Sequence, residues 1–398
     1  MSRTVGTTVR GIRMPIIKQG DNLVEMVVEA VRNAAAAENF SLGERDVIGI
    51  TESVVARAQG NYVTIDDIAK DVRAKFGGEE LGTVFPILSR NRFSIVLKGL
   101  ARGVKRIILQ LSYPADEVGN HLMDIDQMDE LGINPFTDVL TEEEYRRLFG
   151  QEVKHPFTCI DYIRMYREIA ENEGAKLEVI LANDPRVILR YTKKVLAADI
   201  HTRNRTKRFL HRAGAEKVCG LDDLCTVSHD GSGFNPQFGL LGSNKASEER
   251  IKLFPRDGEA FVLAVQNRIR EKTGINVEVM IYGDGAFKDP VGKIWELADP
   301  VVSPAYTPGL CGLPNELKLK YYADNQLRNL EGEECQEAMK KYIREKSCDL
   351  MGSMDSQGVT PRHLTDLLGS LCDLTSGSGD KGTPVVLIQG YFDNYASE

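Results

Sequence analysis

Hydrophobic and polar positions along the chain alternate between helical and strand spacing. After a polar turn at 20–22, the apolar residues of LVEMVVEAVRNAAAA recur at helical intervals and predict a helix over 23–37. The segment DVIGIT (46–51) predicts a strand, the polar segment 64–76 a second helix, and VKRIILQLSY (104–113) a buried strand. This alternation is typical of an α/β or mixed α+β fold.

The amino-acid composition changes between about residues 116 and 258. Acidic helical segments, a basic run at 201–212 and a Gly/Ser/Asn-rich stretch at 228–245 occur there. Within this region, KLEVILAND (176–184), a helical stretch and AEKVCGLDD (215–223) follow a strand, helix, strand order. The region is therefore predicted to be an inserted α/β domain.

The last third returns to strong strand patterns at 275–285 and 383–391, with a helical segment at 315–346 between them. Together these patterns predict a mixed α/β (α+β) fold. We expect a core with one inserted domain, divided as follows: core 1–115, insertion 116–258, core 259–398.

Composition narrows the class of protein. A chain of 398 residues with 42% apolar and 27% charged residues is typical of a globular protein of about two or three compact units, and is not that of a disordered chain. The net charge of -8 disfavours a nucleic-acid coat protein. Seven widely spaced cysteines, and no apolar run long enough for a secretion signal or a membrane span, predict a soluble cytoplasmic protein with reduced thiols.

The clearest site signal is the glycine- and serine-rich loop at 376–384, just before the last strand. Backbone N–H groups of such a loop can approach a phosphate closely, Lys381 adds a cation, and Asp380 is available to a metal. The loop is not a Walker A motif, because the G-x-x-x-x-G-K-[ST] spacing does not occur. The alternative is an ordinary flexible turn at the entry to a strand.

Carboxylates at two strand ends are candidate metal ligands. The strand at 275–285 ends in Gly283-Asp284-Gly285, where Asp284, with Asp289 as a second ligand, can hold Mg²⁺ or Mn²⁺. The alternative for this site is a turn stabilised by Asp and Gly.

The second cluster follows the strand at 104–113 and contains Asp116, Glu117, Asn120 and His121. These side chains suit a metal, and His121 suits a base, although an acidic cap on the following helix is an equal alternative.

Two amino-terminal segments complete the candidates. Met14, Pro15, Ile16 and Ile17 can cradle a flat base, and Thr51, Glu52, Ser53 and Arg57 offer polar contacts after a strand. Spacing alone favours ordinary packing for both segments.

Other motifs give little or no support for a zinc site, an RNA-binding surface or a hydrolase. The residues Cys219, Cys225, His229 and His211 lack the C-x₂-C pairing of structural zinc sites. The basic run at 201–212 is more typical of a solvated helix face than of an RNA-binding surface. No G-x-S-x-G or H-E-x-x-H motif is present, which removes two hydrolase classes.

Taken in order, the candidate segments resemble the coenzyme F-420:L-glutamate ligase family, the gamma-glutamyl ligases that extend the tail of a deazaflavin cofactor. The family's opening pattern, G-[IL]-P-x-[IV]-x-x-G-D-[DN]-L, is similar to residues 11–23, which carry extra residues before the proline. The next signature, D-V-[LI]-V-[VI] followed by S-x-x-[VI]-S-K-A-E-G, resembles residues 46–60, with Arg57 in place of the lysine.

The family's metal-ligating aspartate at a strand end resembles Asp284, and its late loop, G-E-G-x-x-G-x-P, resembles residues 377–384. Ser378 stands where the family has a glutamate, so the resemblance implies either the loss of one metal ligand or its substitution by Asp380. A further family aspartate has Asp116 as its nearest counterpart by order.

The resemblance implies a gamma-glutamyl ligase-like fold, GTP as co-substrate, Mn²⁺ or Mg²⁺, and a homodimer. The nucleotide's gamma-phosphate would move to an acceptor carboxylate, and the amine of L-glutamate would attack the acyl phosphate. The implied catalytic residues are Asp284 and Lys381, and the implied metal ligands are Asp284, Asp380 and Asp116. The implied nucleotide-binding residues are Met14, Pro15, Ile16, Ile17, Glu52, Ser53, Arg57, Gly377, Ser378, Gly379 and Gly382.

Three alternatives stay open. The acceptor is either coenzyme F-420-0 or another small carboxylate. A protein that binds nucleotide and metal without turnover is the rival from a different class, and an enzyme should bring at least two of Asp116, Asp284, Asp289 and Asp380 to one ion. The third, an independent nucleotide-binding unit from residue 176 onward, is disfavoured because G-x-G-x-x-G is missing after its strand.

Overall fold

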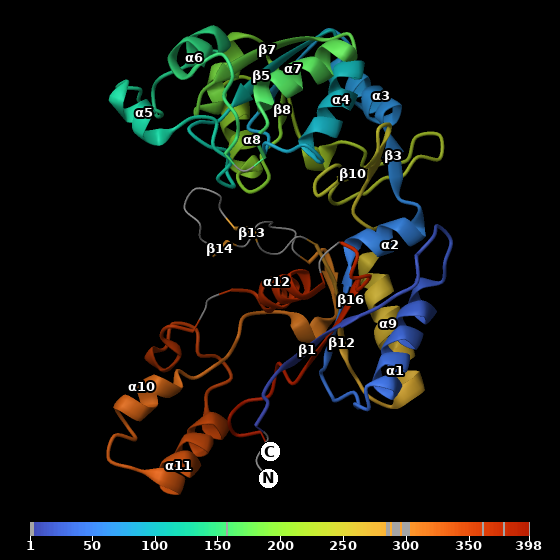
Figure 1. Ribbon diagram of the computed structural model, residues 1–398, viewed down its shortest axis with the longest axis vertical. Coiled ribbons are helices and arrows are strands. Elements are labelled where there is room, and N and C mark those ends of the chain that lie inside the picture. Colours follow the sequence, from blue (N-terminus) through green and yellow to red (C-terminus); the bar gives the residue numbers. More distant parts are fainter. Residues whose placement is uncertain are drawn as a thin grey trace.

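A computed structural model of the chain describes residues 4–156, 158–283, 287–288, 295–296, 303–359, 362–376 and 379–397. Figure 1 shows two bulky parts, one above the other, and an arm that carries α10 (Leu319–Asp324) and α11 (Gly332–Glu345). The arm has its own apolar cluster, which includes Tyr322, Met339 and Ile343.

The lower part is built on a five-stranded sheet, here called the core sheet. Its strands lie in the order β1 (Thr8–Ile12), β16 (Val385–Gln389), β2 (Val47–Thr51), β12 (Glu278–Tyr282) and β15 (Ala305–Tyr306). β2 and β12 run parallel, and the other neighbours pair antiparallel. Every residue of β12 is buried, as expected for a central strand covered on both faces.

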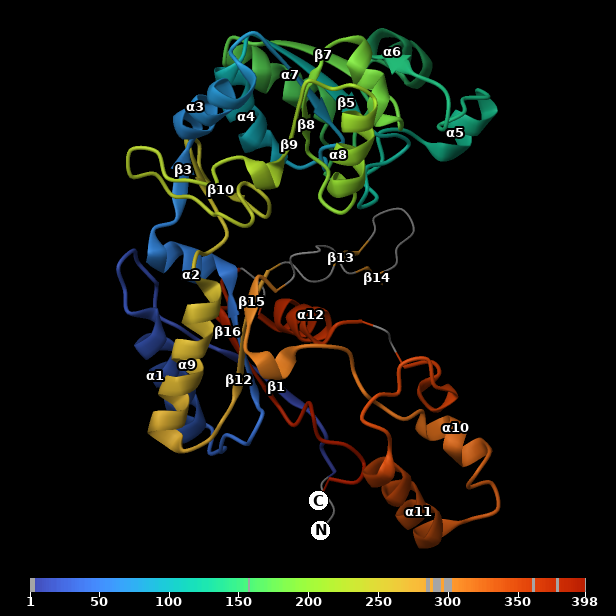
Figure 2. The ribbon, with the colours of Figure 1, turned by 180° about the vertical axis from the view of Figure 1, so that it is seen from behind.

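Helices cover both faces of the core sheet. α1 (Leu23–Ala37) and α9 (Gly258–Thr273) pack side by side against one face, as Figure 2 shows from behind. They bury valines and isoleucines at helical spacing against β2 and β12, and Asn22 caps the first turn of α1. α12 (Leu364–Ser376) covers the opposite face.

The upper part contains a six-stranded sheet, here called the second sheet. Its order is β6 (Leu140–Thr141), β7 (Lys176–Leu181), β5 (Arg106–Leu111), β4 (Glu80–Val84), β8 (Lys194–Ala197) and β9 (Lys217–Gly220). All neighbours except the β6–β7 pair are parallel. Without β6, the order is β7-β5-β4-β8-β9. When these strands are numbered 1 to 5 along the chain, starting at β4, this is the order 3-2-1-4-5 of a doubly wound sheet, and the direction of winding reverses between β4 and β8.

Alternate residues of these strands point into two different cores. Ile107 and Leu109 pack in the larger cluster, with α3 (Ile65–Phe76), α4 (Phe93–Gly103) and α7 (Tyr162–Asn172). Ile108 packs on the other face, with the 3₁₀ helix η1 (Pro185–Arg190) and α8 (Arg203–Arg212). α5 (Ile125–Glu130) and α6 (Glu142–Phe149) lie toward the β6 edge.

A three-stranded antiparallel sheet, here called the linking sheet, stands between the two parts. It has the order β10 (Asn244–Ser247), β11 (Arg250–Lys252) and β3 (Tyr62–Thr64). The remaining short elements are η2 (Leu221–Asp223), β13 (Phe287–Lys288), β14 (Trp295–Glu296), η3 (Pro308–Leu310) and η4 (Met354–Ser356).

The mixed α/β class is confirmed, but the strand pairing differs from the division expected at residue 115. β4 and β5 were assigned to the first core segment, yet they pair with β7 and β8 of the central segment. The chain therefore leaves the core sheet after α2 (Glu52–Gln59) and returns to it at α9. The helical stretch expected after residue 184 is also interrupted, because β8 lies within it.

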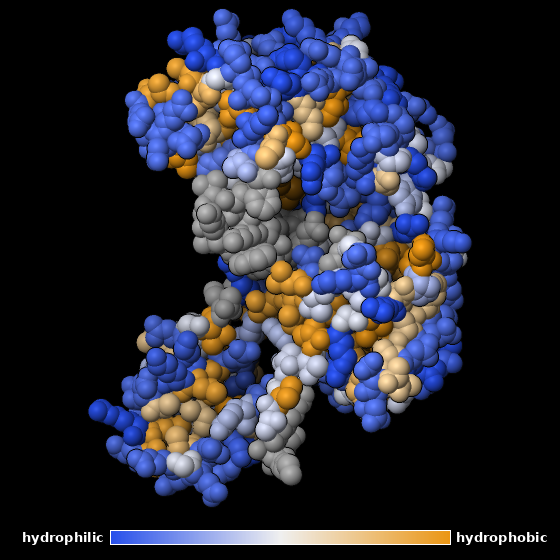
Figure 3. Space-filling view, viewed as in Figure 1, coloured by the Kyte–Doolittle hydropathy of each residue, from blue (hydrophilic) through white to orange (hydrophobic). Residues whose placement is uncertain are grey.

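Among the described residues, no helix is both long enough and apolar enough to cross a membrane. In the space-filling view, hydrophilic residues cover most of the visible surface of the upper part (Figure 3).

Gly49, in the middle of β2, tests the packing between the core sheet and α12. A Cβ at this position would lie 2.4 Å from the Cys372 sulfur and 3.2 Å from a ring carbon of Tyr282. We expect Gly49→Ala to lower the free energy of unfolding by about 1–3 kcal/mol, because an overpacked core must shift. Urea denaturation measures this change.

The clash with the sulfur makes the effect of two substitutions non-additive. Gly49→Ala combined with Cys372→Ala should cost less than the sum of the two single changes. Gly6→Ala is the control, since a Cβ there meets nothing within 4 Å. Strict additivity in this cycle would contradict the described packing.

Candidate functional site

A cavity of about 750 Å³ opens between the core sheet and the linking sheet. Its wall is formed by residues that come from both sheets and from α12. They are Met14, Pro15, Ile16, Ile17, Thr51, Glu52, Ser53, Val54, Arg57, Tyr62, Asn91, Asn244, Lys245, Ala246, Lys252, Tyr282, Gly283, Asp373, Ser376, Gly379, Gly382, Thr383 and Pro384.

The register of the core sheet brings these distant segments together. Ile12 pairs with Val385, and Val385 pairs in turn with Ile50. Thr51 pairs with Tyr282 in the parallel ladder. The end of β1, the start of β16 and the ends of β2 and β12 therefore lie at one edge, so the segments attached to them must meet there.

Backbone hydrogen bonds tie these segments to one another. The Met14 N–H donates to the Gly382 carbonyl at 3.0 Å, and the Thr51 N–H donates to the Pro384 carbonyl at 2.9 Å. The Thr383 hydroxyl donates to the Ser376 carbonyl at 3.1 Å and joins the loop to α12. The candidate base-binding segment and the glycine-rich loop thus form one wall of the cavity.

α2 begins at this edge and presents a cation. Thr51 caps the helix, and Gly60 ends it in the left-handed conformation with φ 63°. Arg57 lies on α2, lines the cavity and is exposed. No ion-pair partner of its guanidinium lies within the described part of the chain, so it is available to an anionic ligand.

Tyr282, at the end of β12, forms a buried part of the wall. Its hydroxyl lies 2.7 Å from the Ser376 hydroxyl. Burial raises the pKa of Tyr282 far above its ordinary value, so the phenol stays protonated at neutral pH. Tyr282 is therefore a neutral hydrogen-bonding group in this wall.

The comparison with protein families agrees with this geometry. The family model described as F-420-0:gamma-glutamyl ligase matches residues 11–390, which is nearly the whole chain. The chain belongs to this ligase family. The match spans both the core sheet and the upper part, so the segments that meet at the cavity lie within it. A search of curated proteins returned no match.

Most of the nucleotide-binding residues suggested by the ligase resemblance line this one cavity. They are Met14, Pro15, Ile16, Ile17, Glu52, Ser53, Arg57, Gly379 and Gly382. Gly377 and Ser378 lie outside the described residues, as do Asp284 and Asp289. Asp380 and Lys381 are exposed on the same loop as Gly379 and do not form part of the cavity wall.

Glu52 lines the cavity, but its carboxylate already has two partners. Oε1 forms an ion pair of 3.0 Å with Lys252 of β11, and the Thr51 hydroxyl donates to Oε2 at 2.9 Å. Both charged side chains are nearly buried, at 10% exposure for Lys252 and 8% for Glu52. The pair joins α2 to the linking sheet, so Glu52 acts mainly as an anchor.

Asp116 lies in the upper part and does not line the cavity, contrary to the metal site suggested for it. It accepts hydrogen bonds from the N–H groups of Leu88, Val118 and Asn120 and from the Asn120 amide. Burial raises the pKa of Asp116, although these hydrogen bonds oppose the shift. Its carboxylate closes a turn, whereas the cap of the following helix α5, expected as the alternative here, is Asp124.

The neighbouring Glu117 occupies a position where doubly wound folds often bind phosphate. Its carboxylate accepts the N–H groups of Ile200, His201 and Thr202, just before α8, where the winding of the second sheet reverses. An internal anion therefore fills this place, which disfavours the nucleotide-binding unit considered for residues 176 onward.

A metal site is only partly defined by the described residues. Within the ranges that the structure describes, no group of three or more His, Cys, Asp or Glu is placed to hold a metal ion, and this includes Cys219, Cys225 and His229. Mg²⁺ and Mn²⁺ at nucleotide sites need only one or two carboxylates, because phosphates and water fill the other positions. Asp373 of α12 places one carboxylate on the cavity wall, which is the type of ligand that such an ion takes.

Sequence reasoning missed several residues of the cavity. Tyr62, Asn91, Asn244, Lys245 and Lys252 come from the linking sheet and the loop before α4. No local spacing marks them, because tertiary packing across the linking sheet places them at the site. The basic run at 201–212, in contrast, forms α8, where Arg203 and Lys207 pair with Asp222 at 3.0 Å each.

Removal of one partner from the buried ion pair between Glu52 and Lys252 should be strongly destabilising. Lys252→Met would leave the Glu52 carboxylate buried without its cation, and we expect the free energy of unfolding to fall by about 3–5 kcal/mol. Urea denaturation followed by circular dichroism measures the loss.

A double variant separates the charge from the packing. Glu52→Gln with Lys252→Met removes both charges and should recover a large part of the lost stability. Lys105→Met breaks an exposed pair with Glu79 and should cost about 1 kcal/mol or less. A similar small cost for Lys252→Met would show that the buried pair does not anchor the linking sheet.

Proposed function

We propose that this ligase-family protein uses GTP and a divalent cation to join L-glutamate to a carboxylate acceptor, F-420-0 or a related small molecule. The observation that carries the proposal is the meeting of the family's characteristic segments around one cavity. Residues 14–17, 51–54, Arg57, Gly379 and 382–384 contribute to its wall. Its volume of about 750 Å³ is in the range of small-molecule sites.

Each segment has a distinct chemical use in this proposal. The apolar segment 14–17 offers a surface and main-chain groups for a base, with Ile16 80% exposed. Gly379 and Gly382 carry no Cβ that could keep a phosphate away from the backbone, and the space around both positions is open, since a Cβ at either would meet nothing within 4 Å. Arg57 faces the same cavity and can neutralise phosphate charge.

The reaction needs two bond exchanges. An oxygen of the acceptor carboxylate attacks the gamma-phosphorus, the bond to the beta-phosphate oxygen breaks, and GDP leaves. The glutamate amine then attacks the acyl carbon, the amide bond forms, and inorganic phosphate leaves with one proton released to solvent. Both steps move negative charge, which Arg57 and the backbone N–H groups of the glycine-rich loop stabilise.

The bound cation would supply charge neutralisation between the phosphates, and Asp373 and Asp284 are the residues proposed to hold it. Asp373 lines the cavity, and Asp284 follows Gly283, which also lines it, although Asp284 itself lies outside the described residues. The rival function is a regulator that binds nucleotide without turnover. The absence of a carboxylate cluster from the described residues is the observation that favours this rival.

Calorimetric titration with GTP and ATP, with and without Mn²⁺, tests the proposal. We expect metal-dependent binding of GTP that Asp284→Ala abolishes. Arg57→Ala should weaken it about tenfold or more, because a charge-assisted hydrogen bond is lost. Arg32→Ala removes an exposed arginine of α1 that lies outside the cavity wall, and it should bind GTP like the wild type.

Product formation then separates the enzyme from the regulator. The ligase reading requires GDP, phosphate and a glutamylated product when GTP, L-glutamate and F-420-0 are supplied together. Nucleotide binding without any product from a panel of carboxylates would favour the regulator. Failure of the wild type to bind either nucleotide would refute both functions.

A further inference from the structure

We propose that β10 of the linking sheet forms the acceptor-binding wall of the site, and that the Lys245 ammonium binds an anionic group of the acceptor. The inference rests on the proposed ligase function and adds the residue that recognises the second substrate. Two different parts of the chain form the cavity wall. The segments with family signatures form one side, whereas Asn91, Asn244, Lys245 and Ala246 approach from the upper part and the linking sheet.

The side chains on this second side are mainly hydrogen-bond donors. Asn91 and Asn244 carry amides, and Lys245 and Lys252 carry ammonium groups. Lys252 already forms an ion pair with the buried carboxylate of Glu52. Among the described residues that line this side, Lys245 is therefore the cation that an acceptor can use.

Lys245 has only a weak competing partner. It pairs with Glu248 on the same hairpin, and the Glu248 side chain is 80% exposed. An exposed pair contributes roughly 0–1 kcal/mol, so an anionic ligand can replace Glu248 at little cost. The Lys245 side chain is itself 33% exposed, and the residue lines the cavity.

The backbone of Lys245 is held on both sides. Its N–H donates to the Asn91 carbonyl at 2.9 Å, and the residue pairs with Ile251 of β11. The register of β10 shifts between Lys245 and Ser247, as in a β-bulge. Bulges redirect side chains at the edge of a sheet, and β10 is such an edge strand.

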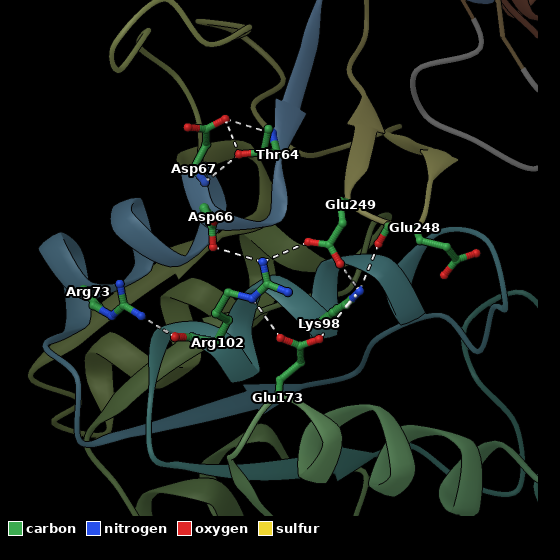
Figure 4. Close-up of polar contacts among 9 residues, drawn as sticks. All are labelled: Thr64, Asp66, Asp67, Arg73, Lys98, Arg102, Glu173, Glu248 and Glu249. Atoms are coloured by element: carbon green, nitrogen blue, oxygen red, sulfur yellow. Dashed lines mark hydrogen bonds and ion pairs between the residues drawn. The ribbon is translucent and has the colours of Figure 1, made fainter.

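A cluster of charges fixes the hairpin that carries Lys245 (Figure 4). Lys98 of α4 contacts the Glu248 carbonyl at 3.0 Å and the carboxylate of Glu249. Arg102, one turn further along α4, binds Glu249 at 2.9 Å and Glu173 at 2.8 Å. These contacts form a network and not an isolated surface pair, so the hairpin is held in place before any ligand binds.

The two walls come from different parts of the chain, and we assign them to different substrates. Arg57 and the glycine-rich loop lie on the core-sheet side, where the nucleotide is proposed to bind. The acceptor carboxylate must meet the gamma-phosphate from the other side, which is the side of β10. A cation there offsets the repulsion between an anionic acceptor and the phosphates.

The test compares Lys245→Ala and Lys245→Arg with the wild type in two assays. One measures the KM for F-420-0 at saturating GTP and L-glutamate, and the other measures the Kd for GTP by calorimetry. We expect Lys245→Ala to raise the KM about tenfold or more with kcat much less affected, because uniform binding is lost, and Lys245→Arg to restore most of the affinity. The Kd for GTP should stay unchanged.

Lys105→Ala, which removes an exposed lysine of the upper part, is the control for a general loss of charge. A wild-type KM in Lys245→Ala, or a Kd for GTP that rises as much as in Arg57→Ala, overturns the inference while the ligase function stands. A wild type that makes no product from F-420-0 overturns the inference as stated for that acceptor, and a wild type that makes none from the whole panel of carboxylates overturns the proposed function as well. Thermal unfolding of each variant shows whether it remains folded.

Discussion

The register between four strands of the core sheet is the constraint on which the rest of the structure depends. Because Ile12 pairs with Val385 and Thr51 with Tyr282, segments more than two hundred residues apart end at one edge of the sheet. A shift of one residue in any of these pairings would move the side chains of a strand to the opposite face of the sheet, out of the core in which they pack. The apolar cores on both faces, with α1 and α9 on one and α12 on the other, therefore fix the site as well as the fold.

The second constraint is the attachment of the linking sheet. The buried pair between Glu52 and Lys252 joins it to α2, and the network of Lys98 and Arg102 joins its hairpin to α4. A buried ion pair adds little net stability compared with apolar packing, but it tolerates no loss of one partner. Such a pair suits a junction that must hold one geometry, because it penalises every arrangement that separates the charges.

The sequence was informative where structure is encoded locally, and much less so elsewhere. The strand DVIGIT, the capped helix that begins at Ile65 and the meeting of the loops around Met14, Arg57 and Gly382 could all be predicted from short patterns or from family motifs. The pairing of β4 with β8 could not be predicted, since it joins residues more than a hundred positions apart.

Asp116 was misplaced for a related reason. In the sequence, a carboxylate after a strand looks the same whether it binds a metal or closes a turn, and only the hydrogen bonds of Asp116 with Leu88 and Asn120 show which role it has. Lys245 carried no signal at all, because the linking sheet alone brings it to the cavity.

The central claim is that nucleotide binds at the edge of the core sheet and not in the doubly wound second sheet. Hydrogen–deuterium exchange, measured by mass spectrometry with and without GTP and Mn²⁺, tests this claim most directly. The account predicts slower exchange in peptides that cover residues 14–17, 51–57 and 379–384. Protection confined to residues 85–92 and 198–203, which follow β4 and β8, would contradict it and place the nucleotide in the upper part of the molecule.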